Sequence, residues 1–122
     1  MANKIVHFEI MGSDGEALAG FYREVFGWDP EPVEGTDGYH LVGEEDTGVG
    51  GAVGQGTEEM QSYVTMYLGV DDIDEHLAKI EGTGGATVTP KQVIPGVVAF
   101  ALFRDPAGNV MGLAENETPP AE

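Results

Sequence analysis

A histidine and a glutamate share one face of the first predicted strand. Apolar and polar side chains alternate along residues 5–10, so that Phe8 and Ile10 point one way and His7 and Glu9 the other. An imidazole with a neighbouring carboxylate can act as a general base whose orientation the carboxylate controls. Two roles therefore remain open for His7 and Glu9: an acid–base pair, or polar residues that line a cavity.

A second strand, predicted at residues 63–70, carries three hydrogen-bonding side chains on one face. Tyr63, Thr65 and Tyr67 alternate with a set of apolar residues, which are Val64, Met66 and Leu68. We expect the apolar set to pack under a helix and the polar set to face away from it. Aromatic rings with a few hydrogen-bonding groups are typical of the wall of a small-molecule site.

The composition narrows the classes of function. The 122 residues include 22 Asp and Glu against 5 Lys and Arg, a formal net charge of −17, and no cysteine. A missing thiol excludes thiolate catalysis and disulfides, and the negative charge argues against nucleic-acid and anionic-membrane partners. The acidity has two explanations, a host with high internal salt or a crevice for a cationic ligand. We favour high salt, because the acids are spread along the chain.

The length predicts one domain, at residues 1–115, followed by a frayed acidic tail at residues 116–122. The first residues contain no long apolar stretch, and no run approaches the ~18 residues that a membrane span needs. We therefore expect a cytoplasmic protein.

Helix signals follow both of the strands that carry the polar sets. Ser13 and Glu16 match a capping box at the start of a first helix, and Gly27 is placed to end it. In the second half, Asp71 or Asp72 is placed to cap a helix that a glycine-rich stretch at 82–85 ends. A shift of 58 residues superimposes the two halves, which predicts two βαβββ modules at about residues 4–54 and 62–115.

The remaining segments complete each module with short strands. Residues 28–33 suggest an edge strand interrupted by proline, residues 39–42 another strand, residues 44–47 an acidic loop, and residues 48–54 a glycine-rich strand. In the second half, Asp105 and Gly108 bound a turn between two apolar runs, which predicts an antiparallel hairpin.

Several of these motifs together resemble the vicinal oxygen chelate superfamily, which includes glyoxalase I, extradiol dioxygenases and bleomycin-resistance proteins. The motifs are Phe21-Tyr22 followed by Phe26-Gly27-Trp28, the stretch Val70–Asp74, Gly84-Gly85 and the closing Asp105–Asn109. The resemblance covers about residues 5–115. It implies an α+β fold in which two modules form a curved, mostly antiparallel eight-stranded sheet with two helices on its convex side.

The resemblance also implies where metal-dependent members hold their ion. Those positions fall on His7, Thr65, Gly112 and either Gly51 or Ala52 in this sequence. Only the histidine can ligate strongly, whereas a stable site wants at least three protein ligands. We therefore expect no metal and no cofactor.

What the resemblance implies about function leaves two classes open. One is a metal-free binding protein of the bleomycin-resistance type, whose concave pocket binds an unknown small organic molecule through His7, Glu9, Tyr63, Thr65 and Tyr67. The other is a glyoxalase-like lyase or isomerase that uses His7 and Glu9 as acid and base, or an incomplete metal site. Chains of this length in the superfamily usually pair, so we also expect a homodimer.

Overall fold

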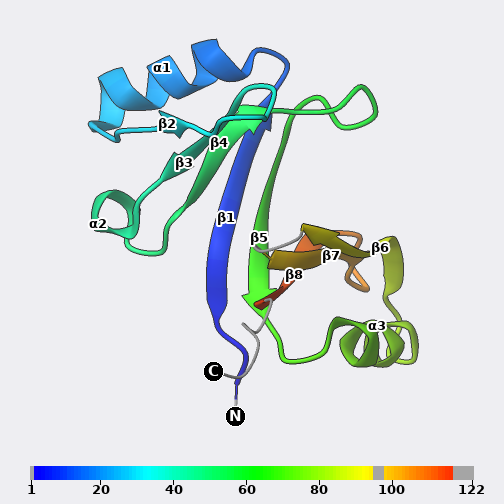
Figure 1. The fold of residues 1–122 in the computed structure, drawn as a ribbon. Coiled ribbons are helices and arrows are strands. Elements are labelled where there is room, and N and C mark those ends of the chain that lie inside the picture. Colours follow the sequence, from blue (N-terminus) through cyan, green and yellow to red (C-terminus); the bar gives the residue numbers. More distant parts are fainter. Residues whose placement is uncertain (1, 95–97, 117–122) are drawn as a thin grey trace. The chain divides into compact units, whose positions relative to one another are not determined.

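A computed structural model describes residues 2–94 and 98–116 (Figure 1). The chain forms two compact units: a first-half unit of residues 6–66, and a second-half unit of residues 1–5 with residues 67–122. Strand β5, Tyr63–Gly69, runs from the first unit into the second. The hydrogen-bonded strand order is β2-β3-β4-β1-β5-β8-β7-β6, with parallel and antiparallel pairs. The predicted α+β, eight-stranded fold is confirmed.

The first-half unit contains one long helix, one short helix and four strands besides the start of β5. In chain order these elements are β1 (Ile5–Gly12), α1 (Gly15–Phe26), β2 (Glu31–Pro32), β3 (Tyr39–Val42), α2 (Glu44–Thr47) and β4 (Gly51–Gln55). β1 runs parallel to β4, and the β2–β3 and β3–β4 pairs are antiparallel.

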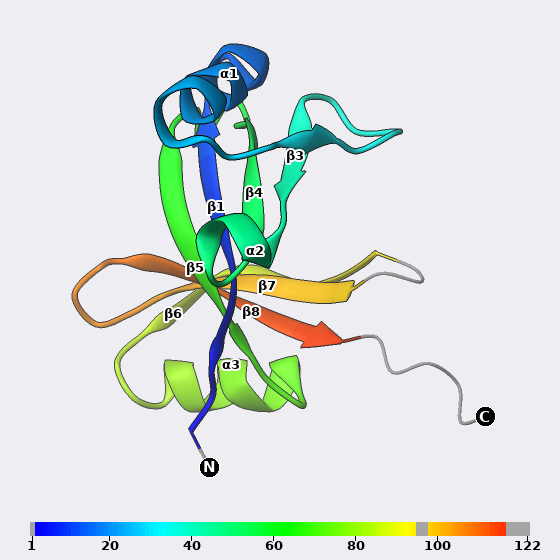
Figure 2. The same ribbon diagram turned by 90° about the vertical axis from the view of Figure 1, so that its left-hand side faces the viewer.

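The second-half unit repeats this arrangement after the end of β5. Its elements are α3 (Ile73–Glu81), β6 (Ala86–Ile94), β7 (Val98–Arg104) and β8 (Val110–Asn116). β5 runs parallel to β8. β6, β7 and β8 pair antiparallel (Figure 2). The predicted tail lies outside the described residues apart from Asn116, which is the last residue of β8.

Short polar side chains cap both long helices. The cap of α1 is Asp14, whose side chain accepts a hydrogen bond from the Ala17 amide at 3.1 Å, so the prediction of Ser13 was wrong by one residue. Either side chain can serve as an N-cap, and the residue with extended backbone geometry at the boundary takes the role. Asp72, one of the two residues predicted to cap α3, is its cap, and Gly27 ends α1 as predicted, in left-handed geometry.

The acidic loop expected at residues 44–47 was also predicted wrongly, because these residues form α2. The described residues therefore form three helices and not the two that were predicted. Gly48, with a φ of +86°, ends this single turn, and its amide donates to the Glu44 carbonyl at 2.7 Å. Three acids in the first turn favour helix formation by interacting with the amide end of the helix dipole.

Each unit has its own apolar core under its long helix. In the first half, Ala19 of α1 packs with Val42 and Val53 of the strands. The second-half core is larger and consists of Val70, Ile73, Leu77, Ala99, Ala101, Phe103 and Leu113.

The apolar face predicted for residues 64–68 is only partly used. Leu68 packs against the second-half core as expected, but Val64 and Met66 are exposed, so the expectation that they pack under a helix was wrong. Val6, which shares the parity of Phe8 and Ile10, is exposed as well. Alternation places a side chain on a face, but the length of the covering helix decides which of them are buried.

The predicted hairpin of the second half is confirmed between β7 and β8. The Gly108 amide donates to the Asp105 carbonyl at 2.8 Å, and the Asp105 carboxylate accepts from the amides of Ala107 and Asn109. No helix among the described residues is long and apolar enough to cross a membrane.

Candidate functional site

Three strands of the first-half unit bring a histidine, a glutamate and two tyrosines together. The hydroxyl of Tyr39 lies 3.1 Å from Nε2 of His7 and donates a hydrogen bond to Oε2 of Glu9 at 2.8 Å. The hydroxyl of Tyr63 points to the other carboxylate oxygen, Oε1, at 3.5 Å. We call these four residues the His7 network.

The strand register explains why Tyr39 reaches the histidine. Tyr39 lies opposite Gly54 of β4, and Gly54 lies opposite Met11 of β1. Paired residues share a face of a sheet, and so do alternate residues along one strand. Tyr39 therefore lies on the same face as Met11, Glu9 and His7.

Small residues on β4 leave room for this contact. A Cβ atom added to Gly54 would lie 2.6 Å from the carbonyl oxygen of Gly38 and 3.4 Å from Cδ1 of Tyr39. Ala52, opposite Glu9, is fully buried. The glycine-rich composition of β4 thus serves the close backbone approach that the sequence suggested.

Burial and charge shift the titration of two members of the network. Burial lowers the pKa of His7, and the charge of the Glu9 carboxylate opposes this by raising it. Burial also raises the pKa of Tyr63 to about 12, with contributions from the charge of Glu9 and the hydrogen bond to it. At neutral pH the imidazole is therefore mainly unprotonated, and the Tyr63 phenol keeps its proton.

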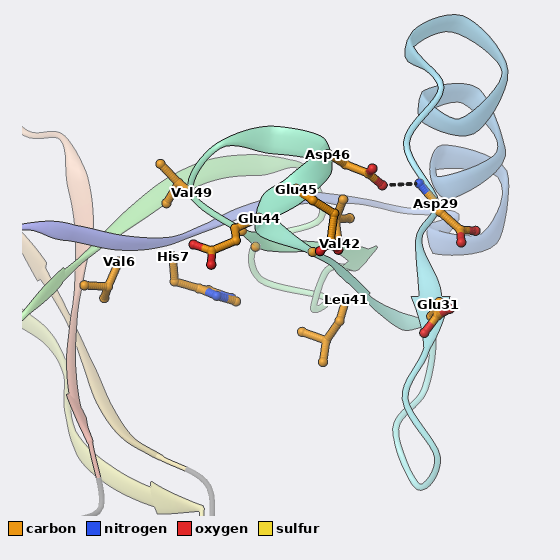
Figure 3. Close-up of a pocket in the computed structure, with 13 residues that line it drawn as sticks. Val6, His7, Asp29, Glu31, Leu41, Val42, Glu44, Glu45, Asp46 and Val49 are labelled. Atoms are coloured by element: carbon orange, nitrogen blue, oxygen red, sulfur yellow. Dashed lines mark hydrogen bonds between the residues drawn. The ribbon is translucent and has the colours of Figure 1, made fainter.

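His7 lines an open pocket of about 630 Å³ in the first-half unit (Figure 3). Its apolar wall comes from the side chains of Val6, Leu41, Val42 and Val49, together with a backbone stretch of Gly43, Gly50 and Gly51. Leu41 and Val49 are exposed, which leaves apolar surface for a ligand to cover.

The rest of the pocket wall is acidic. Five carboxylate side chains line it, from Asp29, Glu31, Glu44, Glu45 and Asp46. Asp46 also accepts a hydrogen bond from the backbone amide of Asp29 at 2.9 Å, which ties α2 to the chain before β2 (Figure 3). No lysine or arginine is among the described residues that line this pocket.

The five predicted site residues take different places. His7, Glu9 and Tyr63 belong to one hydrogen-bonded network, and among the described residues that line the pocket His7 is the one member of the predicted set. Thr65 is buried in the first-half unit. Tyr67 belongs to the second-half unit, where it pairs with Gly112 of β8 and is buried.

The sequence reasoning missed Tyr39 and the pocket acids. Tyr39 was recognised as the start of a strand, and its parity with His7 depends on pairing through β4, which a single strand pattern does not reveal. The available signal in the sequence was the spacing of fifteen residues between Tyr39 and Gly54, which pair across β3 and β4. The acids of α2 were visible as a charge run, but their position beside His7 follows from the fold.

The two other histidines lie elsewhere. His40 pairs with Val53 on the opposite face of β3 and is buried, with no hydrogen-bond partner for its Nδ1 atom in the part of the chain that is described. His76 lies on α3, where its Nδ1 atom is 3.0 Å from the Asp72 carbonyl oxygen.

The residues at the implied metal positions do not fit a divalent ion. Ala52 offers no donor atom and is fully buried, and at Gly112 any side chain would clash with the ring of Tyr67. Thr65 supplies a neutral hydroxyl, which is a poor ligand compared with an imidazole or carboxylate. Among the described residues, no three His, Cys, Asp or Glu side chains gather as a metal-binding group.

Known proteins are similar to this chain over most of its length. A Mycobacterium tuberculosis protein named "Putative glyoxylase CFP32" is 29% identical over 111 residues, which is 86% of this chain and 42% of the relative. The anthracycline biosynthesis protein DnrV of Streptomyces peucetius is 28% identical over 117 residues, covering 83% of this chain and 42% of the relative. The chain thus spans about 42% of the length of the curated relatives that it matches.

Solved structures agree on the fold. The methylmalonyl-CoA epimerase of Mycobacterium tuberculosis superimposes with a TM-score of 0.67 at 15% identity, over 93% of this chain and 88% of the epimerase. A glyoxalase/bleomycin resistance protein/dioxygenase superfamily member from Vibrio splendidus 12B01 gives a TM-score of 0.65 at 13% identity, over 94% of this chain and 99% of the other. At these identities the likeness establishes the fold alone.

The fold has two parallel strand pairs, and in each of them the first strand is followed by a capped helix and two further strands before its partner. This is the fold of the vicinal oxygen chelate superfamily, as the sequence motifs predicted. Within it, the model of the glyoxalase-like domain matches residues 7–114. The chain belongs to the glyoxalase-like domain family.

Proposed function

We propose that this protein binds a small, neutral or cationic organic molecule in the pocket beside His7, without a metal ion. The observation that carries the proposal is the position of His7, which both contacts the Tyr39 hydroxyl and lines a pocket of about 630 Å³. A cavity of that size with an apolar wall and a few polar groups suits a small organic ligand.

The charge of the pocket restricts the ligand. Five carboxylates line a pocket in a chain whose formal net charge is −17. Their combined field repels anions and attracts cations, most strongly at low ionic strength. A ligand that carries a phosphate or carboxylate is therefore disfavoured, which sets this pocket apart from one built for an anionic substrate.

A matched set of three fragments tests both the place and the charge of the ligand. Benzylamine, benzyl alcohol and benzoate share one aromatic ring and differ in charge. We expect benzylamine, and more weakly benzyl alcohol, to shift the NMR signals of His7 and Leu41, and benzoate to shift neither. Binding of benzoate as strong as that of benzylamine, or shifts confined to other regions, would contradict the proposal.

Two variants locate the binding energy. Glu44→Gln removes one pocket charge at nearly constant shape and should weaken benzylamine binding while leaving benzyl alcohol binding unchanged. Glu58→Gln, outside the residues that line the pocket, is the matched control and should change neither. His7→Ala should weaken both fragments with little loss of stability.

The His7 network supports a role for its neighbours in the proposed site, because tyrosine hydroxyls contact both oxygens of Glu9. We propose that Glu9, Tyr63 and Thr65, which belong to the same unit as His7, contribute to ligand binding with it, as the family resemblance implies. Elemental analysis of the purified protein tests the absence of a metal. A stoichiometric divalent ion that is lost in His7→Ala would overturn the metal-free proposal.

The assembly and setting of the protein are proposals that rest on the sequence. We propose a homodimer in the cytoplasm of a host with high internal salt. Light scattering after size exclusion in molar KCl should give twice the 12.9 kDa chain mass. The melting temperature should rise from low to molar KCl because salt screens the repulsion among the 22 acids, and a flat or falling trend would contradict the salt proposal.

A further inference from the structure

We propose that Tyr39 is a positioning residue that holds the proton of neutral His7 on Nε2 and thereby makes Nδ1 the nitrogen that accepts a proton. This inference rests on the proposed function, because it assigns a chemical role to the histidine of the proposed ligand site. It adds a residue that the sequence reasoning did not single out, and it favours the acid–base class over simple cavity lining.

The direction of the hydrogen bonds carries the assignment. An ionised carboxylate only accepts, so the single proton of the Tyr39 hydroxyl goes to Oε2 of Glu9, 2.8 Å away. The hydroxyl oxygen is then an acceptor toward His7, and Nε2 at 3.1 Å must carry the proton. In the neutral ring the lone pair is consequently on Nδ1.

The surroundings of Glu9 favour donation of the Tyr39 proton to the carboxylate and not to His7. Tyr63 also points its hydroxyl to Glu9, at 3.5 Å from Oε1, so both carboxylate oxygens face phenol donors. Glu9 is 9% exposed, and water competes little for its oxygens. Rotating the Tyr39 proton toward His7 would take a hydrogen bond from a buried carboxylate, which is costly.

The same chain of hydrogen bonds stabilises the protonated ring. When Nδ1 accepts a proton from a bound acid or from water, the bond from the donor atom to its hydrogen breaks, the electron pair stays on the donor, and a new N–H bond forms on the imidazole. The positive charge on the ring is then offset by Glu9 through the Tyr39 hydroxyl. This is the logic by which a carboxylate supports a histidine base, here with a phenol between the two.

The other charged and titratable groups near the histidine come from several elements. Glu9 lies on its own strand, Tyr63 on β5, and Glu44, Glu45 and Asp46 reach the pocket from α2, with Asp29 and Glu31 from the chain around β2. The carboxylates of the pocket can favour a positive charge on His7, but a carboxylate cannot be both a donor to Glu9 and an acceptor from Nε2. A hydroxyl can, and Tyr39 supplies it.

Nitrogen NMR of the ligand-free full chain, with labelled histidine, tests the assignment directly. At a pH where the ring is neutral, we expect His7 to show a protonated Nε2 and an unprotonated Nδ1. His7→Gln identifies its signals, and His76 on α3 is an internal reference. Detection of the opposite tautomer in the wild-type protein overturns the inference even if no variant folds.

A pair of phenol deletions separates positioning from packing. Tyr39→Phe should shift His7 from one tautomer to a mixture and lower its pKa further, because the ring loses its link to Glu9. Tyr63→Phe removes a hydroxyl from the same carboxylate but leaves Tyr39 in place, and it should leave the Nε2–H form predominant. A Tyr39→Phe variant that folds and keeps the wild-type tautomer and pKa of His7 would overturn the inference.

The two proposals can fail separately. The tautomer is measured without ligand, so the wrong tautomer overturns the role of Tyr39 and leaves the fragment-binding result standing. If the tautomer is as expected and no fragment perturbs the pocket, the ligand proposal fails and the positioning of His7 by Tyr39 stands.

Discussion

The two halves of the chain have the same strand register but carry different kinds of side chain at equivalent positions. In the first half Glu9 of β1 lies opposite Ala52 of β4. In the second half Tyr67 of β5 lies opposite Gly112 of β8, which is the corresponding position of the corresponding parallel pair. The first half has a polar network on these positions and a core of three buried residues, whereas the second has the larger apolar core.

The residue that completes the network shows the difference most clearly. Tyr39 pairs with Gly54 in the first half, and at the corresponding place in the second half Phe100 pairs with Ala114. A phenylalanine has no hydroxyl with which to join a histidine to a carboxylate. The comparison teaches that a duplicated fold can keep its backbone pairing while one copy specialises in stability and the other in a polar site.

The largest expected effect comes from weakening the second-half core. Ile73 of α3 is completely buried, so Ile73→Ala should lower the free energy of unfolding by about 2–5 kcal/mol through lost burial and the cavity left behind. Urea denaturation measures it. Val93→Ala, at a position that is 56% exposed, is the control and should change stability by less than about 0.5 kcal/mol. Equal losses in the two variants would contradict the assignment of the core.

A second prediction sharpens the account of the polar half. Burial and Glu9 raise the pKa of Tyr63 to about 12, so Glu9→Gln should lower this pKa toward its ordinary value near 10. The folded protein should also lose stability as the pH rises from about 10 to about 12, because the unfolded chain releases the phenol proton first. Phenolate absorbance, with Tyr63→Phe to identify the signal, measures the titration. An unchanged Tyr63 pKa in Glu9→Gln would contradict the contribution of the carboxylate.

The titration of His7 gives a smaller effect at the other end of the pH range. Because its pKa is lowered by burial, the unfolded chain binds a proton more readily than the folded one. The His7 contribution to stability should therefore fall as the pH drops below about 6.5, the ordinary value, and level off below the folded pKa. Thermal melts of wild type and His7→Gln should differ in slope in this window. Parallel curves would show that His7 is not buried as described.

The smallest expected effect concerns the hairpin turn of the second half. Asp105 is exposed, and its pKa is lowered chiefly by the hydrogen bond from the Asn109 side chain, at 2.9 Å. Asn109→Ala should raise that pKa toward its ordinary value, as measured by carboxyl NMR. A lowered carboxyl pKa stabilises the fold fully above the unfolded value, near 3.9, and this contribution is lost as the pH falls through the folded pKa. The difference in stability between the two proteins should therefore disappear in acid. An Asp105 pKa that does not move would assign the shift to the backbone amides instead.

Local patterns predicted the elements that depend on local interactions. The alternation at residues 5–10, the cap at Asp72 and the stop at Gly27 each rest on neighbours within a few residues, and all three are confirmed. The Asp105 turn belongs to the same class. Where two side chains could serve equally, as Ser13 and Asp14 could at the start of α1, local chemistry did not choose between them, and the backbone geometry at the boundary did.

The composition of the site depended on long-range pairing. Residue type and alternation within a single strand were enough to select His7, Glu9 and Tyr63 as candidates. Neither criterion requires knowledge of which strands pair. Tyr39 required the register of β3 on β4 and of β4 on β1, and the acids of α2 required the turn that begins after Gly43. A strand's side chains alternate whatever its neighbours are, whereas the atom that a hydroxyl meets is decided by which strands pair and in what register.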